Sequence, residues 1–231
     1  MKRQMKWLNV LLAAAIGVLG FAPAGALGAP FPIARIYFEY NSSANDLGVH
    51  VFLDAEDWRT VKIVHPDGRT IFDVTGKGGW GELGMTELFF EGAEPNLDEF
   101  PLEELLELFP EDRYTFQGVM VDGGRLMSRP RLSHAIPAGP VVSSQVSGNN
   151  VVISWTHVTA PPAGFPSRPI TIVGYQVIVE SFQVTLPATA STLTLPAEFA
   201  GSLSSGAHPF EVLAIEASGN QTITEGSFTK P

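Results

Sequence analysis

Two stretches in the second half of the chain alternate strictly between apolar and polar positions. The first spans residues 150–155 and carries Trp155 on its apolar face, and the second spans residues 172–179 and carries Val173 and Tyr175 on that face. Successive side chains of a β-strand point to opposite sides of a sheet, so each stretch predicts a strand with one buried face.

Further short strands are predicted on both sides of this pair, separated by turn residues. They cover residues 141–146, 183–186, 191–195, 209–215 and 221–224. Seven short strands at this spacing predict an antiparallel β-sandwich over residues 136–231.

The first half of the chain also alternates, and strong turn signals divide its strands. Residues 34–40 and 49–53 predict two strands. Pro66-Asp67-Gly68 predicts one hairpin turn, and Asp122-Gly123-Gly124 predicts another. A second antiparallel β-sandwich over residues 27–135 accounts for this pattern.

One short helix is predicted within this first unit, near residues 101–109. Its apolar residues recur at helical spacing, and acidic residues occupy the opposite face. The apolar residues are Leu102, Leu105, Leu106 and Phe109, and the acidic residues are Glu103, Glu104 and Glu107.

A proline-marked segment, Ile136-Pro-Ala-Gly-Pro140, separates the two patterns and predicts a domain boundary. The predicted fold class is therefore all-β, with two antiparallel β-sandwich domains in tandem. The first domain carries the short helix.

The last 95 or so residues resemble a fibronectin type III domain. The resemblance rests on the entry at Pro140, on Trp155, on Gly174-Tyr-Gln-Val177 and on the run from Phe210 to Asn220. The family usually carries a tyrosine before its sixth strand, whose hydroxyl ties down a neighbouring loop, and by spacing His208 stands at that place. The resemblance implies a spacer or partner surface rather than turnover, and fold alone does not fix function.

The first 26 residues have the three-part pattern of a secretory signal peptide. Three cations lie within the first seven residues, an apolar run follows from Leu8 to Ala22, and Ala24-Gly25-Ala26 matches a cleavage site. We expect a secreted or periplasmic protein with no membrane span after signal removal, because no other segment is long and apolar enough to cross a bilayer.

Composition narrows the possible chemistry. The chain has no cysteine, which rules out disulfides, zinc–thiolate sites and cysteine nucleophiles and suggests a bacterial type of export. The formal net charge is −10, and loss of the leader's three cations would make it −13. Such an acidic chain repels phosphate backbones, so we expect no nucleic-acid partner.

The densest group of acidic residues predicts a candidate calcium site. Asp54 and Asp57 follow the second predicted strand, and Asp46 lies upstream in the preceding turn. Carboxylate oxygens in loops suit calcium, but no EF-hand spacing is present, and solvated surface charge explains the same residues.

Two tryptophans, Trp58 and Trp80, lie beside predicted loops of the first unit and are candidate partner-binding residues. Exposed tryptophans stack on sugar rings or anchor protein partners, and the alternative is core packing. The formal G-x-G-x-x-G match at residues 76–81 precedes a predicted strand rather than a helix, which argues against nucleotide binding.

The sequence favours an exported, non-catalytic binding protein whose partner is a protein or a surface polysaccharide. One alternative is a small secreted hydrolase that uses carboxylates of the first unit. It predicts converging acids and a raised carboxyl pKa. The other is a calcium-stiffened structural protein, which requires Asp46, Asp54 and Asp57 to converge.

Overall fold

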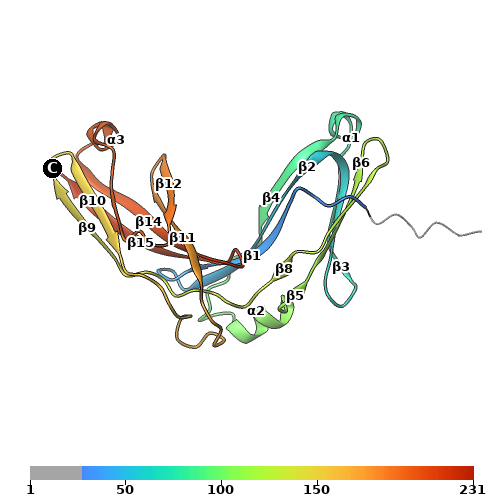
Figure 1. The fold of residues 1–231 in the computed structure, drawn as a ribbon, viewed down its shortest axis with the longest axis horizontal. Helices are drawn as coiled ribbons and strands as arrows, with labels where there is room; N and C mark the ends of the chain where they lie inside the picture. The colour runs from blue at the N-terminus through green and yellow to red at the C-terminus, as the bar shows by residue number, and fades with distance from the viewer. Residues whose placement is uncertain (1–27) are drawn as a thin grey trace, which may run out of the picture.

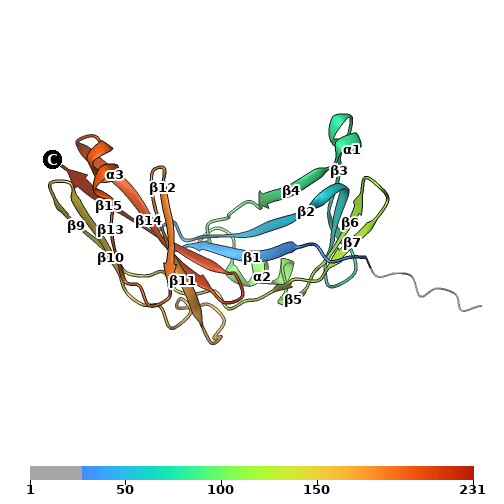
Figure 2. The same cartoon turned by 45° about the horizontal axis from the view of Figure 1, so that its top comes forward.

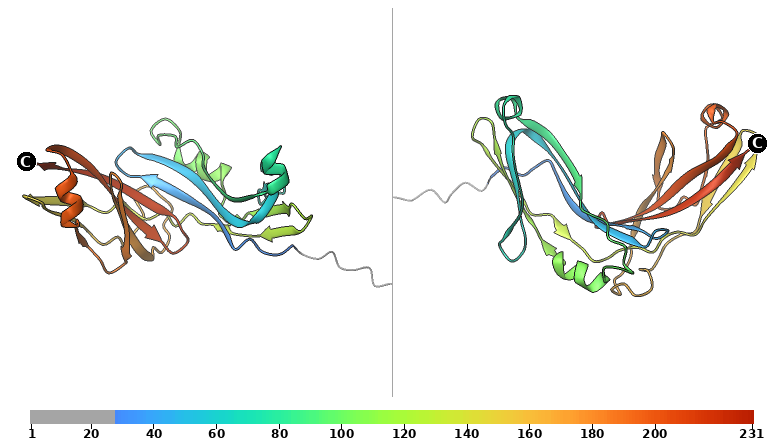
Figure 3. Two further views of the ribbon diagram at one scale, coloured as in Figure 1. Left: turned by 90° about the horizontal axis from the view of Figure 1, so that it is seen from above. Right: turned by 180° about the vertical axis from the view of Figure 1, so that it is seen from behind.

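The computed structural model describes residues 28–231, so the predicted signal peptide at residues 1–26 lies outside the described residues. Within this range the predicted all-β class is confirmed, with strands in both halves of the chain. The molecule forms a V with two arms, as Figure 1 shows. Helix α1 (Gly79–Leu83) lies at the tip of one arm, α3 (Ala197–Ser202) at the tip of the other, and α2 (Leu102–Leu108) on the convex side. The view from behind in Figure 3 shows the same arrangement.

The C-terminal arm is the predicted seven-stranded antiparallel sandwich. Trp155, Tyr175 and Phe210 fill the core between its two sheets. One sheet has the order β13 (Thr192–Thr194), β10 (Asn150–Trp155), β9 (Val142–Ser147), and the other has the order β12 (Phe182–Pro187), β11 (Ile172–Val179), β14 (Gly206–Glu216), β15 (Gln221–Lys230).

One residue of this arm differs from its predicted position. Val173 was expected on the buried face with Tyr175, but it is 55% exposed. The pairing of β11 with β14 shifts register between Ile172 and Gly174. Such an irregularity adds a residue to one strand, so the side chains before it switch faces.

The N-terminal arm is built on one long strand, β2 (Asp46–Val64). The sequence pattern predicted a strand over residues 49–53 that ends before Asp54, but the backbone continues through a bulge between Asp54 and Trp58. Two strands lie end to end along each edge of β2. One edge pairs with β1 (Ile33–Asn41) and then β6 (Thr115–Met120), and the other pairs with β4 (Met85–Glu91) and then β3 (Thr70–Thr75).

Helix α2 covers one face of this sheet and closes its core. Leu105 of α2 belongs to the same buried apolar cluster as Phe38, Leu53 and Trp58 of the sheet, so the predicted apolar stripe faces inward. The remaining strands complete the arm: β7 (Arg125–Ser128) pairs with β6, and β5 (Asp112–Arg113) pairs with β8 (Arg131–Leu132).

The two arms share one sheet. Strand β1 pairs in parallel with β15, with Glu39 opposite Gln221, so a ten-stranded sheet runs from one arm into the other. Figure 2 shows β1 in the middle of this sheet. The buried apolar side chains nevertheless form two separate clusters, one within residues 31–136 and the other within residues 151–228.

Asn220, in the turn before β15, is fully buried at this joint. Its Oδ1 accepts a hydrogen bond from the Phe38 amide at 2.8 Å. Its Nδ2 donates to the carbonyl oxygens of Ser133 and Ala135 at 2.8 and 3.1 Å. A single side chain from the C-terminal arm therefore satisfies three backbone groups of the N-terminal arm.

Candidate functional site

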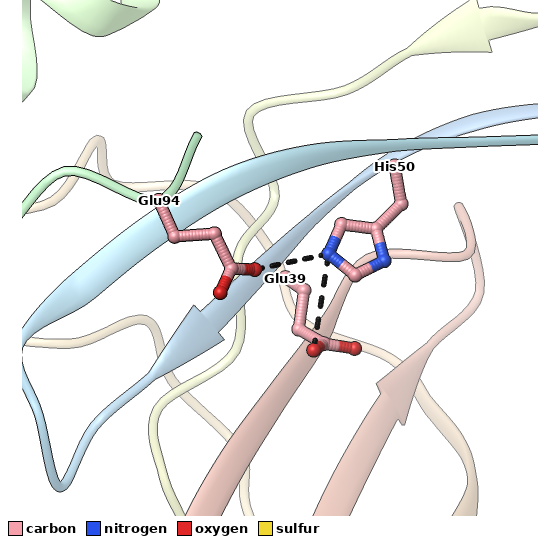
Figure 4. A group of neighbouring side chains, drawn as sticks. All are labelled: Glu39, His50 and Glu94. Atoms are coloured by element: carbon pink, nitrogen blue, oxygen red, sulfur yellow. Dashed lines mark hydrogen bonds and ion pairs between the residues drawn. The ribbon is translucent and has the colours of Figure 1, made fainter. Parts of the chain in front are cut away.

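Three side chains with metal-ligating atoms converge near the joint. They are Glu39 of β1, His50 of β2 and Glu94 of the loop after β4, and their ligand atoms all lie within 4.8 Å of one another. Figure 4 shows both carboxylates directed toward the same ring nitrogen of His50. His50 Nε2 lies 3.1 Å from Glu94 Oε1 and 3.8 Å from Glu39 Oε1.

The alternation of the strands places this group on the face of the sheet away from α2. Val49 and Val51 point into the core beneath, so His50 points to the other side. Glu39 of β1 is paired with Gly48 of β2, which lies two residues before His50. Glu39 therefore points to the same face of the sheet as His50. A side chain at Gly48 would place its Cβ 2.5 Å from Glu94 Cγ, so the glycine leaves the space through which Glu94 reaches His50.

Aromatic rings pack against the imidazole of His50, and carboxylates surround its Nε2 atom. The His50 residue is only 3% exposed, because the rings of Tyr37 and Phe89 lie against it at centroid distances of 5.3 and 5.8 Å. A third carboxylate, that of Glu91, has an oxygen 3.8 Å from Nε2. One ring N–H therefore faces three carboxylates.

Burial raises the pKa of the Glu39 carboxyl above its ordinary value. The nearby charges of Glu94 and Glu91 raise this pKa further, whereas His50 and a hydrogen bond from Gln221 oppose the shift. An imidazole and two carboxylates at this spacing are a ligand set for a transition-metal ion. A carboxyl group with a raised pKa is also what acid–base catalysis requires.

The acidic residues predicted to bind calcium are not brought together. Within residues 28–231, the Glu39, His50 and Glu94 group is the one set of three or more such ligands that converges. Asp46 and Asp54 are separated by eight residues of extended strand, about 26 Å at the rise of a β-strand. Asp46 does border the site, and burial together with the charge of Glu94 raises the pKa of its carboxyl.

Sequence reasoning missed this group because its members come from three elements. The one local signal was His50, which stands between Val49 and Val51 at a polar position of an apolar strand. Neither Glu39 nor Glu94 differs in sequence context from the other acidic residues of this unit.

The two candidate tryptophans have opposite environments. Trp58 is 1% exposed in the core of the N-terminal arm, so its ring cannot reach a partner. Trp80 is 71% exposed on α1, and Leu83 of the same helix is 80% exposed. The structure therefore leaves Trp80 as the accessible one of the pair.

An apolar cavity of about 280 Å³ lies on the opposite face of the sheet from His50. Side chains of the sheet, of β3 and of the end of α2 line it, including Val51, Phe72, Phe90 and Phe109. The cavity is separated by the sheet from the Glu39, His50 and Glu94 group.

Among residues 28–231, no helix has the length and apolar character needed to cross a membrane.

No protein-family model matches the chain, and no curated protein matches its sequence. Among solved structures, it is similar to the spore cortex lytic enzyme SleM of Clostridium perfringens at 18% identity and a TM-score of 0.33, over 41% of this chain and 28% of that one. It is also similar to fibronectin(III)-like modules of CbhA from Clostridium thermocellum at 15% identity and a TM-score of 0.32, over 86% of this chain and 91% of the modules.

A third similar structure is a tetra-tandem repeat from the extending region of a large adhesion protein. It has 13% identity and a TM-score of 0.30, over 86% of this chain and 50% of that one. The structural neighbours thus include fibronectin-like and adhesin modules. At these identities and TM-scores, the likenesses carry no argument about what this chain binds or does.

Proposed function

We propose that the protein is an exported, non-catalytic binding protein that contacts a protein partner through the tip of its N-terminal arm. The observation that carries this proposal is the exposure of Trp80 and Leu83 on one short helix. Large apolar side chains that gather in the open favour association, and tryptophan is enriched among residues that dominate binding energy.

The chain presents this tip by interrupting an edge strand. Strands β3 and β4 pair with consecutive parts of β2, and between Thr75 and Met85 the chain leaves the edge to form α1. The excursion places α1, which carries Trp80 and Leu83, at the end of the arm, away from the C-terminal sandwich (Figure 1). The sheet beneath provides a fixed support for the tip.

A protein partner accounts for the tip better than a polysaccharide. A sugar ring would stack on the indole of Trp80 and would need polar groups beside it for its hydroxyls. Leu83 offers only apolar surface, which suits an apolar side chain of another protein. A protein partner would therefore use the apolar surface of Leu83, whereas a sugar would not.

The test is binding of the labelled chain from residue 27 to intact cells of the producing culture, before and after protease treatment. We expect Trp80→Ala and Leu83→Ala each to weaken binding at least about tenfold, as loss of a central anchor does. Val173→Ala, a matched control at an exposed position of the C-terminal arm, should bind like the wild type.

Two other outcomes would overturn the proposal. Binding that survives protease, fails in Trp80→Ala and is unchanged in Leu83→Ala would identify a polysaccharide partner. Binding that is equal in all three variants would place the partner surface elsewhere.

The hydrolase alternative is favoured by one observation, the convergence of the Glu39, Glu91 and Glu94 carboxylates at His50, where burial raises the pKa of Glu39. It predicts turnover of chromogenic glycosides by the wild type and loss of that turnover in Glu39→Gln. Absence of turnover over a broad panel of such substrates would reject the hydrolase alternative and leave binding as the one proposed function.

A further inference from the structure

We infer that Glu39, His50 and Glu94 form a binding site for one first-row divalent cation, of which Zn²⁺ fits the ligand set best. The inference goes beyond the proposed binding function and does not depend on it, because the site and the α1 tip are separate. It also differs from the calcium site expected from Asp46, Asp54 and Asp57 in both residues and metal.

The ligand types select the metal. An imidazole nitrogen suits zinc and other first-row transition metals, whereas calcium and magnesium prefer oxygen ligands throughout. Zinc binds three protein ligands of the imidazole and carboxylate types and keeps a fourth position for water or another group. The Glu91 carboxylate lies 3.8 Å from His50 Nε2 but is outside the group of three whose ligand atoms all converge, so the fourth position is left to water or another group.

The charge of the group favours a cation independently of ligand preference. Three carboxylates lie within 4 Å of one imidazole nitrogen, and that nitrogen has at most one proton to donate. His50 is more than nine-tenths buried with Nε2 directed into the group, and the Glu39 side chain is only 15% exposed, so water screens these two residues poorly. A divalent ion would replace that single proton and offset more of the negative charge.

The outer contacts are those of a built site. Gln221 of β15 donates a hydrogen bond from Nε2 to the Glu39 oxygen that does not face His50, and such partners orient metal-ligating carboxylates. The absence of a side chain at Gly48 gives Glu94 its path to the group. Because Gln221 belongs to the C-terminal arm, a bound ion would stabilise the joint between the arms.

The first measurement is thermal unfolding of the tag-free chain from residue 27, with EDTA, with ZnCl₂ and with CaCl₂. A ligand that binds only the native state raises the unfolding midpoint by mass action. We expect the midpoint to rise with Zn²⁺ and to stay near the EDTA value with Ca²⁺. Competition with a chromogenic chelator should give one high-affinity Zn²⁺ per chain.

Glu94→Gln is the decisive variant, because Glu94 is partly exposed and its loss should not prevent folding. We expect it to raise the Kd for Zn²⁺ at least about tenfold, the lower end of the effect seen even when an outer-shell partner is lost. The matched control is Glu103→Gln on the exposed face of α2, which should keep the wild-type Kd.

Three results would overturn the inference. They are no midpoint shift with Zn²⁺ in the wild type, an equal shift with Ca²⁺, and an unchanged Kd in Glu94→Gln. The last would show that zinc binds elsewhere on this acidic chain.

Discussion

At the scale of single residues, His208 stands, by spacing, where the family that the C-terminal sequence resembles usually carries a tyrosine. Its Nε2 donates a hydrogen bond to the carbonyl oxygen of Ser204 at 2.9 Å, and its Nδ1 lies 2.6 Å from Glu180 Oε1. The imidazole thus ties down the neighbouring loop as a tyrosine hydroxyl would. The hydrogen bond to the Ser204 carbonyl is the largest cause that raises the pKa of His208 above its ordinary value, and the hydrogen bond to Glu180 raises it further. The charge of Lys230 opposes this shift.

This environment predicts a pH-dependent contribution to stability. Because the folded-state pKa is raised, the contribution of His208 is fully present below its ordinary pKa of 6.5 and is lost as pH rises through the raised value. We expect the difference in unfolding midpoint between the wild type and His208→Gln to be largest near pH 5.5 and to shrink toward pH 8. Glutamine keeps a neutral donor at this position, so a difference independent of pH would contradict the assignment.

At the scale of elements, the turn from α1 into β4 depends on Gly84. This residue has φ +82° and ψ 176°, a region that is essentially restricted to glycine. A Cβ at this position would also lie 2.7 Å from backbone atoms of Asp57. The conformation holds α1 against the bulge of β2.

Gly84→Ala should therefore lower the free energy of unfolding by about 3 kcal/mol, the upper end of the cost of such a backbone conformation. Gly79, inside α1, has open space around it and no positive φ. Gly79→Ala should change the free energy by less than about 0.5 kcal/mol, as surface substitutions usually do. Urea unfolding of both variants measures the difference, and equal stability of the two would contradict the proposed geometry of the turn.

Elements were predictable from sequence where the pattern is local. The stripe of Leu102, Leu105 and Leu106 predicted α2, and the alternation around Trp155 predicted β10, because each signal spans a few neighbouring residues. The bulge that exposes Val173 was not predictable, since it depends on pairing with a distant strand. The continuity of β2 was missed for the same reason, because partners on both edges hold its polar middle in an extended conformation.

The candidate sites divide in the same way. The sequence places Trp80 beside a predicted loop, and that signal is local. The Glu39, His50 and Glu94 group could not be assembled from sequence, because only the pairing of β1, β2 and β4 brings these residues to one face. The acidic residues before Trp58 predict the end of a strand and a loop, whereas β2 continues through them and buries Trp58.

At the scale of the whole molecule, the joint connects the two arms through one continuous sheet. The parallel pairing of β1 with β15 carries the sheet across it, and buried Asn220 bonds to three backbone groups on the other side. The Thr222 hydroxyl donates a hydrogen bond to the carbonyl of Pro137, in the segment that links the arms, at 2.5 Å. Removing the Asn220 side chain would leave the buried amide of Phe38 and the buried carbonyl of Ala135 without this partner, which costs about 1–3 kcal/mol for each.

The central claim is that this joint holds the α1 tip in a fixed position relative to the C-terminal sandwich. The most direct measurement is the distance distribution between two spin labels, at Lys77→Cys beside α1 and at Glu198→Cys on α3, both exposed positions at the tips of the V. The chain has no cysteine of its own, so only these two sites are labelled. We predict one narrow distribution in the otherwise wild-type chain and a broader one when Asn220→Ala is added. A broad or multiple distribution without the Asn220 substitution would show that the arms move independently and would contradict the account.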